Sequence, residues 1–482
     1  MQRRTFLAIS MAAALSPLAQ GRGRTASAQA RGPFKISLAQ WSLNQTIRAK
    51  KLSNLDFPRA AREVYDIDCV ELVDQFFATK AKDQAYLAEL KKNADDAGVS
   101  IGLLMLDTNG PLAAADDAQR RMAIEKTYPW LDAAAFLGCK TVRVNARGEG
   151  SPDELRSRIA DSCSTLADYA AERKLNLVIE NHGGPSSDPA WLVSVMQAVN
   201  KPNFGVLPDF GNFPNEINRY DAVEAFMPYA KGVSAKASSF TADGECVETN
   251  FHRMMRIVRD GAYQGYVGIE SEVEGADNEP DAILKTRDLL RTIFAEQEKV
   301  QPIFNGKDLE GWTPINGGDW VVENGVAGAR LIGRNGKDWS TNPEKSGSWL
   351  RTNAQYGDFR LELQYAINAG GNSGVFFRSA EAKNPAFTGY EMQIVDFAGK
   401  EPSTSGAGAI YDVVAPAKNL VRPAGQFNAV TIIAKGKQIV IEMNGEKVLE
   451  AELDRAQKGY IGLQNHDDHS EVRFKNIRLQ EL

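Results

Sequence analysis

The chain has 482 residues, with 56 Lys and Arg against 62 Asp and Glu, which gives a formal net charge of −6 at pH 7. This length exceeds what a single hydrophobic core usually holds, so we expect two or three domains. The acidic balance excludes the basic surface typical of nucleic-acid-binding proteins, and we expect no nucleic-acid partner.

The first thirty residues predict an export signal. Arg3 and Arg4 form a twin-arginine pair, residues 8–19 are mostly apolar, and residues 28–30 are a small-residue cleavage site. The apolar stretch is too short to remain as a membrane anchor. We therefore expect a twin-arginine signal peptide over residues 1–30, export to the periplasm, and no stable membrane insertion after cleavage. The competing interpretation is a disordered cytoplasmic extension.

Between residues 34 and 294, short apolar runs alternate with amphipathic stretches. The apolar runs predict eight strands, at residues 35–40, 69–73, 100–106, 141–145, 176–180, 204–209, 231–236 and 266–270. Apolar residues recur at helical spacing in the stretches between them, for example at 83–97 and 152–173. This alternation predicts a (β/α)8, or TIM, barrel over residues 33–296. The four cysteines form no CxxC pair, and we expect buried free thiols.

Beyond residue 302 the hydrophobic period changes from helical to alternating. Residues 438–443 and 471–479 alternate apolar and polar side chains, and Asn444-Gly445 predicts a two-residue hairpin between 438–443 and 447–451. This pattern predicts an all-β sandwich with jelly-roll topology over residues 302–482. The whole chain is therefore expected to be a multidomain protein of α/β plus all-β class.

Three carboxylates stand at the ends of predicted barrel strands. Glu180 ends the fifth strand, Asp209 ends the sixth, and Glu270 ends the eighth. The C-terminal ends of barrel strands form the active-site rim, so these side chains should converge. Because converging carboxylates repel each other, they usually share a cation. A salt bridge explains one such acid, but three at corresponding positions predict a metal site.

Other polar residues are expected at the same rim. His182 lies two residues after Glu180 and should point to the same side, as a metal ligand, a catalytic base or acid, or a structural histidine. Lys236 ends the seventh strand, where it can stabilise an enolate or remain solvated. Arg143 and Asn145 end the fourth strand and are candidates for binding hydroxyl groups, as is Glu71 in the second strand.

The barrel motifs resemble a known superfamily. Residues 178–184, 207–213 and 268–270 are similar to the xylose-isomerase-like sugar isomerase/epimerase barrels, and the resemblance covers about residues 34–294. It implies a rim-bound divalent metal, Mn²⁺ in preference to Mg²⁺, Co²⁺ or Zn²⁺, that acts on keto sugars. The implied ligand set is Glu, Asp, His and Glu. This chain supplies Glu180, Asp209 and Glu270 but departs at the histidine, which would align near Ser234, and His182 is the substitute candidate.

Polar residues also gather on predicted strands of the sandwich. Glu391 and Gln393 share one face of a strand, Arg378 follows another apolar run, and Gln464 and His466 end a third. Acids, amides and an arginine on a sheet face suit the binding of polyhydroxylated ligands. The alternative is a surface ladder of cross-strand polar pairs.

The sandwich motifs also carry a resemblance. Residues 372–378, 389–393 and 459–464 strongly resemble the 3-keto-disaccharide hydrolase domain family, a concanavalin-like sandwich, over about residues 302–481. The resemblance implies a site in which Glu391, Gln393 and His466 are catalytic candidates, and Arg378 and Gln464 are substrate-binding candidates.

Together these features predict a periplasmic enzyme that cleaves 3-keto-glycosides. A ketone at C3 acidifies the C2 proton, so a base can remove that proton and the enolate can expel the C1 substituent. We expect metal-assisted elimination in the barrel, with His182 and Lys236 as catalytic residues, and hydration or hydrolysis in the sandwich. Two alternatives stay open. One is a sugar isomerase or epimerase barrel with an independent 3-keto-disaccharide hydrolase domain, and the other is a carbohydrate-binding module on a degenerate barrel.

Overall fold

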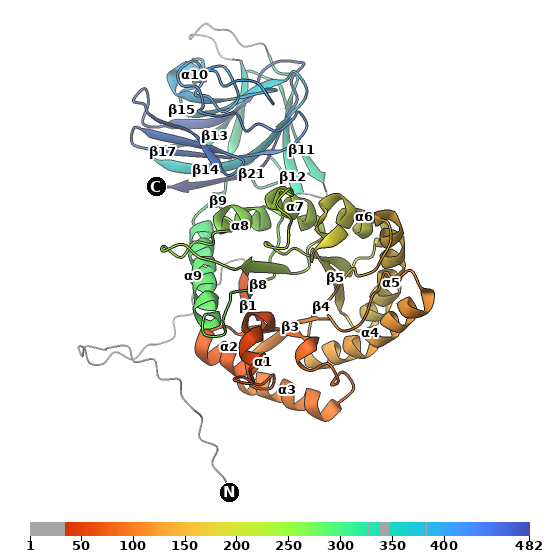
Figure 1. The fold of residues 1–482 in the computed structure, drawn as a ribbon. Coiled ribbons are helices and arrows are strands. Elements are labelled where there is room, and N and C mark those ends of the chain that lie inside the picture. Colours follow the sequence, from red (N-terminus) through yellow and green to blue (C-terminus); the bar gives the residue numbers. More distant parts are fainter. Residues whose placement is uncertain (1–33, 326–327, 338–346, 382) are drawn as a thin grey trace, which may run out of the picture. The chain divides into compact units, whose positions relative to one another are not determined.

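The computed structural model describes residues 34–325, 328–337, 347–381 and 383–482. The predicted signal peptide lies outside the described residues. Gly32–Leu482 form one compact unit, in which a ring of parallel strands and helices is followed along the chain by a stack of antiparallel strands (Figure 1). None of the described helices is long and apolar enough to cross a membrane. The multidomain α/β plus all-β class predicted from the sequence is confirmed.

The first part is a closed parallel barrel, as predicted. Its strands pair in the order β6-β5-β4-β3-β2-β1-β8-β7, and two parallel bridges, Val206 with Ala230 and Asp209 with Ser234, join the β6 side to the β7 side. Each predicted strand overlaps one in the structure: β1 (Lys35–Ala39), β2 (Cys69–Val73), β3 (Ser100–Met105), β4 (Thr141–Val144), β5 (Asn176–Glu180), β6 (Phe204–Leu207), β7 (Val233–Ala237) and β8 (Tyr266–Ser271).

Helices surround this barrel (Figure 1). They are α1 (Asn44–Arg48), α2 (Phe57–Tyr65), α3 (Gln84–Asp96), α4 (Asp117–Leu137), α5 (Pro152–Glu172), α6 (Pro189–Val199), α7 (Arg219–Phe226), α8 (Phe251–Asp260) and α9 (Glu279–Glu298). Local sequence explains where several begin. In α5 the Ser151 hydroxyl and the Glu154 carboxylate exchange hydrogen bonds with each other's backbone, and Pro152 occupies the first turn.

Apolar side chains fill the space between the barrel strands and these helices. The strands are buried on both faces, which is why they read as continuous apolar runs in the sequence. The cysteines Cys69, Cys139, Cys163 and Cys246 are free thiols buried in this part, as expected. Such packing fixes the strand ends rigidly and so holds the rim residues in place.

The second part is a sandwich of antiparallel sheets. Strands β10-β13-β20-β15-β16 form one sheet, and β11-β12-β21-β14-β17-β18-β19 form the other, with β9 (Gln301–Pro302) beside β21. The remaining bounds are β10 (Trp312–Ile315), β11 (Asp319–Gly325), β12 (Gly328–Arg334), β13 (Ser348–Tyr356), β14 (Phe359–Ile367), β15 (Asn372–Ser379), α10 (Pro385–Thr388), β16 (Tyr390–Val395), β17 (Asn428–Lys435), β18 (Gln438–Met443), β19 (Glu446–Glu452), β20 (Gly459–Asn465) and β21 (Val472–Glu481).

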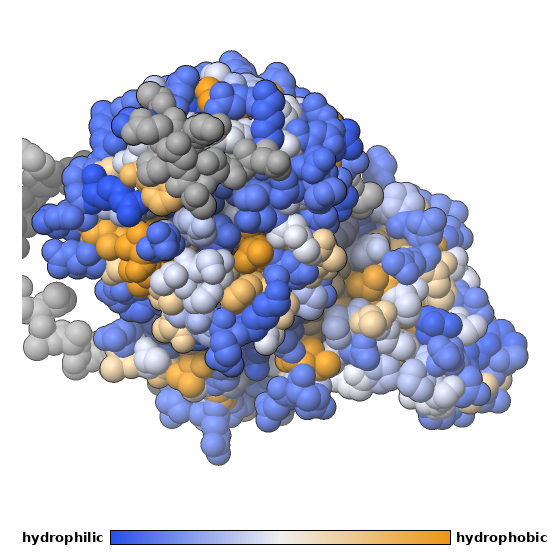
Figure 2. Space-filling model, turned by 90° about the horizontal axis from the view of Figure 1, so that it is seen from above, coloured by the Kyte–Doolittle hydropathy of each residue, from blue (hydrophilic) through white to orange (hydrophobic). Residues whose placement is uncertain are grey.

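Turn chemistry and alternation explain this sandwich. Asn444 and Gly445, at φ +51° and +86°, form the predicted two-residue turn between β18 and β19. Alternate residues of each sheet point into a shared apolar core between the sheets. In the view of Figure 2 the surface is mostly hydrophilic and carries only small hydrophobic patches, as expected for a chain whose apolar residues fill two cores.

Candidate functional site

Three carboxylates converge at the C-terminal rim of the barrel, as the sequence predicts. Glu180, Asp209 and Glu270 are buried, and one oxygen from each lies within 4.8 Å of those of the other two. Burial raises the pKa of Asp209 to about 6, with Glu270 adding to the shift. Burial also raises the pKa of Glu180, and both neighbouring acids raise it further. This crowding of like charges is what a bound cation would relieve.

Two basic side chains offset part of this negative charge. The Arg143 Nε atom lies 2.8 Å from Glu180 Oε2, and its Nη1 atom lies 2.6 Å from Asp107 Oδ1. Lys236 Nζ lies 3.3 Å from Glu270 Oε1 and 2.6 Å from Glu272 Oε2. These carboxylates raise the pKa of Lys236 above its usual value in spite of its burial, so the amine stays charged.

Polar neighbours hold the three acids in place. The Ser234 hydroxyl donates to Asp209 Oδ2 at 2.6 Å and lies 3.5 Å from Glu270 Oε2. Asn181 brackets the Asp209 backbone, donating to its carbonyl and accepting from its N–H. Asn212 donates to Glu180 Oε1 at 3.1 Å. The position where the resemblance implies a histidine therefore holds a hydroxyl that binds two of the acids.

A cavity of about 310 Å³ opens beside the acids. Glu270, Arg143, Lys236 and His182, all predicted site residues, line it together with Trp41 and Glu272. The His182 backbone N–H donates to Ser186 Oγ at 2.9 Å, which fixes the loop after β5. Burial, followed by Arg143, lowers the pKa of the His182 imidazole, so the ring is neutral near pH 7. A neutral imidazole can accept a proton or bind a metal.

Two predicted substrate contacts lie outside this cavity lining. Glu71 points into the barrel, where the Ser37 hydroxyl donates to its Oε1 at 2.6 Å and burial raises its pKa to about 7. Gly268 makes room for it, because a Cβ there would lie 2.6 Å from the Glu71 carboxylate. Asn145 donates to Asp107 Oδ1 at 2.8 Å, beside Arg143. Neither side chain lines the cavity, and both form hydrogen bonds with other barrel residues.

The sandwich brings a second set of predicted residues to one sheet face. Glu391 and Gln393 alternate on β16 with core residues, and Gln464 lies on β20 across the intervening strand β15. Gly374 of β15 allows them to approach each other, because a Cβ there would lie 2.0 Å from Glu391 Oε1. The Gln464 amide hydrogen-bonds the Glu391 carboxyl group. Gln393 Nε2 donates to Asn372 Oδ1 at 3.2 Å.

The Glu391 carboxyl group is buried among neutral groups. Burial raises its pKa to about 8, while the Gln464 hydrogen bond acts in the opposite direction. Its Oε1 atom is buried and has no hydrogen-bond partner among the described residues. An aromatic pair stands on the same face, with the Trp349 and Phe376 ring centroids 5.6 Å apart in a T-shaped arrangement. A neutral carboxylic acid in such surroundings can donate a proton or a hydrogen bond.

His466 follows β20 and is oriented by its neighbour. Its Nδ1 atom lies 2.7 Å from Asp467 Oδ2. The other Asp467 oxygen accepts hydrogen bonds from the backbone N–H groups of His469 and Ser470. A carboxylate on one ring nitrogen leaves the other available as a base.

Arg378 requires a correction to its expected role. Its side chain is buried, and its guanidinium donates to the carbonyls of Gly357, Gly436 and Ala456 and to Asp358 Oδ1. With these contacts the arginine joins three turns of the sandwich. We therefore assign it a structural role in place of the expected substrate contact.

The sequence reasoning missed several residues at these sites. Asp107, Glu272 and Trp41 line the barrel cavity, and Asp467 orients His466. Asp107 and Glu272 come just after β3 and β8. The criterion that selected the triad, a polar residue at the C-terminal end of a barrel strand, would have selected both. No comparable signal marks Trp41.

Two segments of the chain, one in the barrel and one in the sandwich, match known protein families. Residues 58–293 match the family model of the xylose isomerase-like TIM barrel. Residues 299–480 match that of the 3-keto-alpha-glucoside-1,2-lyase-like domain. A 3-keto-disaccharide hydrolase of Bacteroides thetaiotaomicron is 25% identical over 233 residues, covering 37% of this chain and 77% of the relative.

Solved structures are similar to each half separately. A candidate glycosyl hydrolase from Parabacteroides distasonis is 26% identical, with a TM-score of 0.32, and the match covers 39% of this chain and 95% of that one. The 3-keto-D-glucoside 4-epimerase of E. coli is 16% identical, with a TM-score of 0.42, over 54% of this chain and all of the other. Residues 58–293 are therefore similar to xylose isomerase-like TIM barrels, and residues 299–480 are similar to 3-keto-alpha-glucoside-1,2-lyase-like domains.

Proposed function

We propose that this protein cleaves 3-keto-glycosides, with elimination in the barrel and hydration or hydrolysis in the sandwich. The observation that carries the proposal is the pairing of two different acid sites. One is a cluster of three converging carboxyl groups in a xylose isomerase-like barrel, and the other is the single neutral Glu391 in a domain matching 3-keto-disaccharide hydrolases. Elimination from a keto sugar needs a base, an enolate stabiliser and a proton donor.

The residues at the rim suit a divalent cation. Glu180, Asp209 and Glu270 offer hard oxygen ligands within 4.8 Å of one another, and oxygen-rich sites suit Mn²⁺ or Mg²⁺. A divalent ion held there would polarise a sugar carbonyl and favour enolate formation, which is worth several kcal/mol. We propose Mn²⁺ for this site. His182, on the cavity wall, is the candidate for a further ligand or for the base.

The chain's own groups then account for the proton transfers. The neutral His182 imidazole accepts the C2 proton and, as imidazolium, gives it to the leaving C1 oxygen. The charged Lys236 amine stabilises the negative charge that develops on the sugar oxygens. Arg143 pairs with Glu180 and Asp107 and offsets part of their negative charge.

In the sandwich, the Glu391 carboxyl group donates a proton or a hydrogen bond to the unsaturated keto sugar. His466, oriented by Asp467, activates the water that adds to the product. We infer periplasmic action from the twin-arginine pattern at residues 1–30.

A second candidate function has its own support. The cavity at the rim is lined entirely by barrel residues, so the barrel can act without the sandwich. This favours an isomerase or epimerase barrel fused to an independent hydrolase domain. Proton exchange at C2 or C4 of a free keto sugar in D₂O, without release of a leaving group, would select this alternative.

One experiment tests the main proposal directly. The purified protein is incubated with a 3-keto-glucoside that carries a chromophoric leaving group, with and without a chelator. Release that the chelator abolishes, and that added Mn²⁺ restores, is the expected result. Release that ignores the chelator would place cleavage in the sandwich, and a substrate left intact by the protein would reject the proposed activity.

A further inference from the structure

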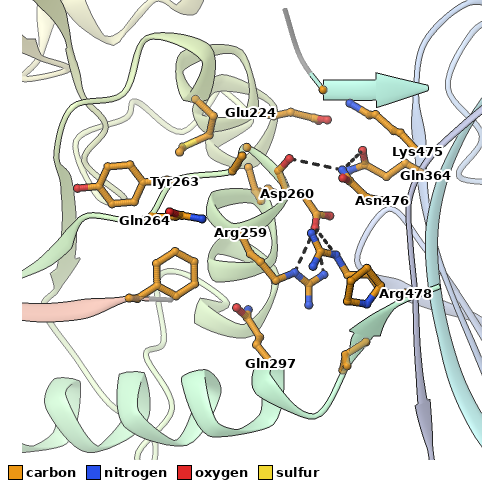
Figure 3. A pocket seen from close by; sticks show the side chains of 18 of the residues that line it. Glu224, Arg259, Asp260, Tyr263, Gln264, Gln297, Gln364, Lys475, Asn476 and Arg478 are labelled. Atoms are coloured by element: carbon orange, nitrogen blue, oxygen red, sulfur yellow. Dashed lines mark hydrogen bonds and ion pairs between the residues drawn. The ribbon is translucent and has the colours of Figure 1, made fainter. Parts of the chain in front are cut away.

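A cavity of about 460 Å³ lies between the barrel and the sandwich (Figure 3), and none of its lining residues belongs to either candidate site. On the barrel side it is lined by the ends of α7, α8 and α9, and on the sandwich side by β14 and β21. The ends of α7 and α8 lead into the N-terminal ends of β7 and β8, opposite the rim that carries the triad. A ligand in this cavity would therefore act independently of the proposed catalytic residues.

A β-bulge in β21 builds the sandwich wall of this cavity. Glu362 pairs with Arg478 and Gln364 pairs with Lys475, so two residues of β21 stand opposite one residue of β14. Asn476 takes the left-handed backbone conformation at this point, with φ +54°. The extra residue lets Lys475, Asn476 and Arg478 all line the cavity, which a regular strand would not allow.

Lys475 is a partly buried cation that none of the described acids pairs directly. Its amine stands 4.3 Å from the centre of the Phe427 ring, and it makes no ion pair or hydrogen bond within the described parts of the chain. Burial lowers its pKa, while Glu224 and Asp260 act in the opposite direction. Glu224 already pairs with Arg422 at 3.1 Å. The free amine therefore offers charge and donors to a molecule in the cavity.

Arg478 adds a second incompletely satisfied cation. Its Nε atom lies 3.7 Å from Asp260 Oδ1 (Figure 3) and has no hydrogen-bond partner among the described residues. Arg259 lies closer to the same oxygen, at 3.1 Å, and also pairs with Glu362 at 2.7 Å. Asp260 is thus shared between two guanidinium groups, which leaves Arg478 able to bind another anion.

Amide groups complete the cavity wall. Asn476 Nδ2 donates to Gln364 Oε1 at 3.2 Å, and Gln297 Oε1 is buried without a hydrogen-bond partner among the described residues. Amides both donate and accept, as hydroxyl groups require. The acids Glu224 and Asp260 nearby disfavour a doubly charged anion such as phosphate, because their repulsion grows with the ligand's charge.

We propose that this cavity binds a small polyhydroxy carboxylate, such as a sugar acid, between the two domains. Lys475 and Arg478 would hold the carboxylate, and the amides of Asn476 and Gln297 would bind hydroxyl groups. The volume is within the usual range for small-molecule sites. Because the ligand would contact β21 and the ends of α8 and α9, its binding would also hold the barrel and the sandwich together.

Isothermal titration calorimetry on the full-length protein tests this proposal, with D-glucuronate as the probe. D-glucose is the uncharged analogue and acetate supplies a carboxylate without hydroxyl groups. We expect saturable binding of glucuronate and at least tenfold weaker binding of both analogues. Lys475→Gln and Arg478→Gln should each weaken glucuronate binding at least tenfold. Lys458→Gln, which changes an exposed lysine of the same domain, should leave it unchanged.

Two further variants separate this site from the catalytic ones. Glu180→Gln and Glu391→Gln should bind glucuronate as the unchanged protein does, whatever their effect on cleavage. The proposal is overturned if glucuronate does not bind, or if binding survives Lys475→Gln but is lost in Glu391→Gln, which would place the probe in the sandwich site. Asn476→Gly is a second test if Lys475→Gln misfolds, because it removes the amide and keeps the left-handed conformation accessible. Weaker glucuronate binding in this variant supports the assignment, and unchanged binding contradicts it.

Discussion

The two candidate sites surround their buried carboxyl groups with different partners. In the barrel, Glu180 and Glu270 stand within ion-pairing distance of Arg143 and Lys236, and Asp209 completes a cluster of charges. In the sandwich, Glu391 stands with an amide and near aromatic rings. In the barrel, basic side chains offset part of the negative charge and the clustered oxygens can hold a cation, whereas in the sandwich no basic side chain of the described residues counters burial and Glu391 keeps a proton. Function therefore follows from what surrounds each acid.

The largest expected effect comes from neutralising the barrel cluster. Glu180→Gln and Glu270→Gln should each reduce metal content and lower the chelator-sensitive reaction about 10³-fold, because one ligand and its charge are lost. Metal analysis of the purified protein and steady-state kinetics measure the two effects. Glu63→Gln, at an exposed position of α2, serves as the matched control. Equal metal content in all three variants would contradict the assignment of the triad as a metal site.

The next effect concerns the proton on Glu391. Its pKa of about 8 predicts that sandwich activity is retained at neutral pH and falls as pH rises through about 8. Glu391→Gln should lower that activity about 10²-fold and remove this limb of the pH profile. The matched control is Glu401→Gln, which changes an exposed acid. A pH profile that is identical in Glu391→Gln and the unchanged protein would contradict the role of this acid.

The same shift has a consequence for stability. The folded-state pKa of Glu391 lies above the usual value of 4.5. Between about pH 4.5 and 8 the native protein therefore keeps a proton on this group that the unfolded chain has already released. Stability from this group is thus fully present below pH 4.5 and declines toward pH 8, by up to about 1.4 kcal/mol per pH unit. Glu391→Gln should lack this decline in denaturant titrations at several pH values.

A smaller effect tests the role of glycine in the sandwich. Gly374→Ala places a Cβ 2.0 Å from Glu391 Oε1, so we expect a loss of about 1–3 kcal/mol in unfolding free energy together with impaired activity. Gly357→Ala is the matched control, because its Cβ would meet its nearest neighbour at 3.6 Å. Chemical denaturation measures both variants, and equal stabilities would show that the sheet face tolerates the methyl group.

The smallest expected effect concerns the orientation of His466. Asp467→Asn should lower the sandwich reaction about tenfold, because the imidazole loses the carboxylate that orients it. Steady-state kinetics measure this effect, and thermal unfolding separates it from simple loss of structure. Asp468→Asn changes the neighbouring, more exposed acid and should leave the reaction unchanged.

The sequence predicted the fold well because both parts follow strict periods. Eight buried apolar runs define the barrel strands, and the alternation of 438–443 before Asn444-Gly445 defines a hairpin. The triad followed from position alone, since strand ends converge in a barrel. Sequence position could not show that Glu71 points below the rim or that Arg378 is enclosed by three backbone carbonyls, because both depend on contacts between distant segments.

The interdomain cavity was also beyond prediction. It depends on a bulge that gives Asn476 a positive φ and on pairing between β14 and β21, neither of which a hydrophobic pattern encodes. A regular alternation would place Lys475 on one face and Asn476 and Arg478 on the other, so the sequence pattern does not bring these three residues together.

The closure of the barrel passes through the proposed metal site. The bridge between Asp209 and Ser234 is one of two that join the β6 and β7 sides, and the Ser234 hydroxyl also binds the Asp209 carboxylate. The backbone N–H groups of Phe210 and Ser234 donate to Ser234 and Pro208 across this seam. A cation bound by Asp209 would stabilise the contact between β6 and β7, so these two amides should exchange their hydrogens with solvent more slowly when Mn²⁺ is present. The ion would then stabilise the closed barrel in addition to taking part in the reaction.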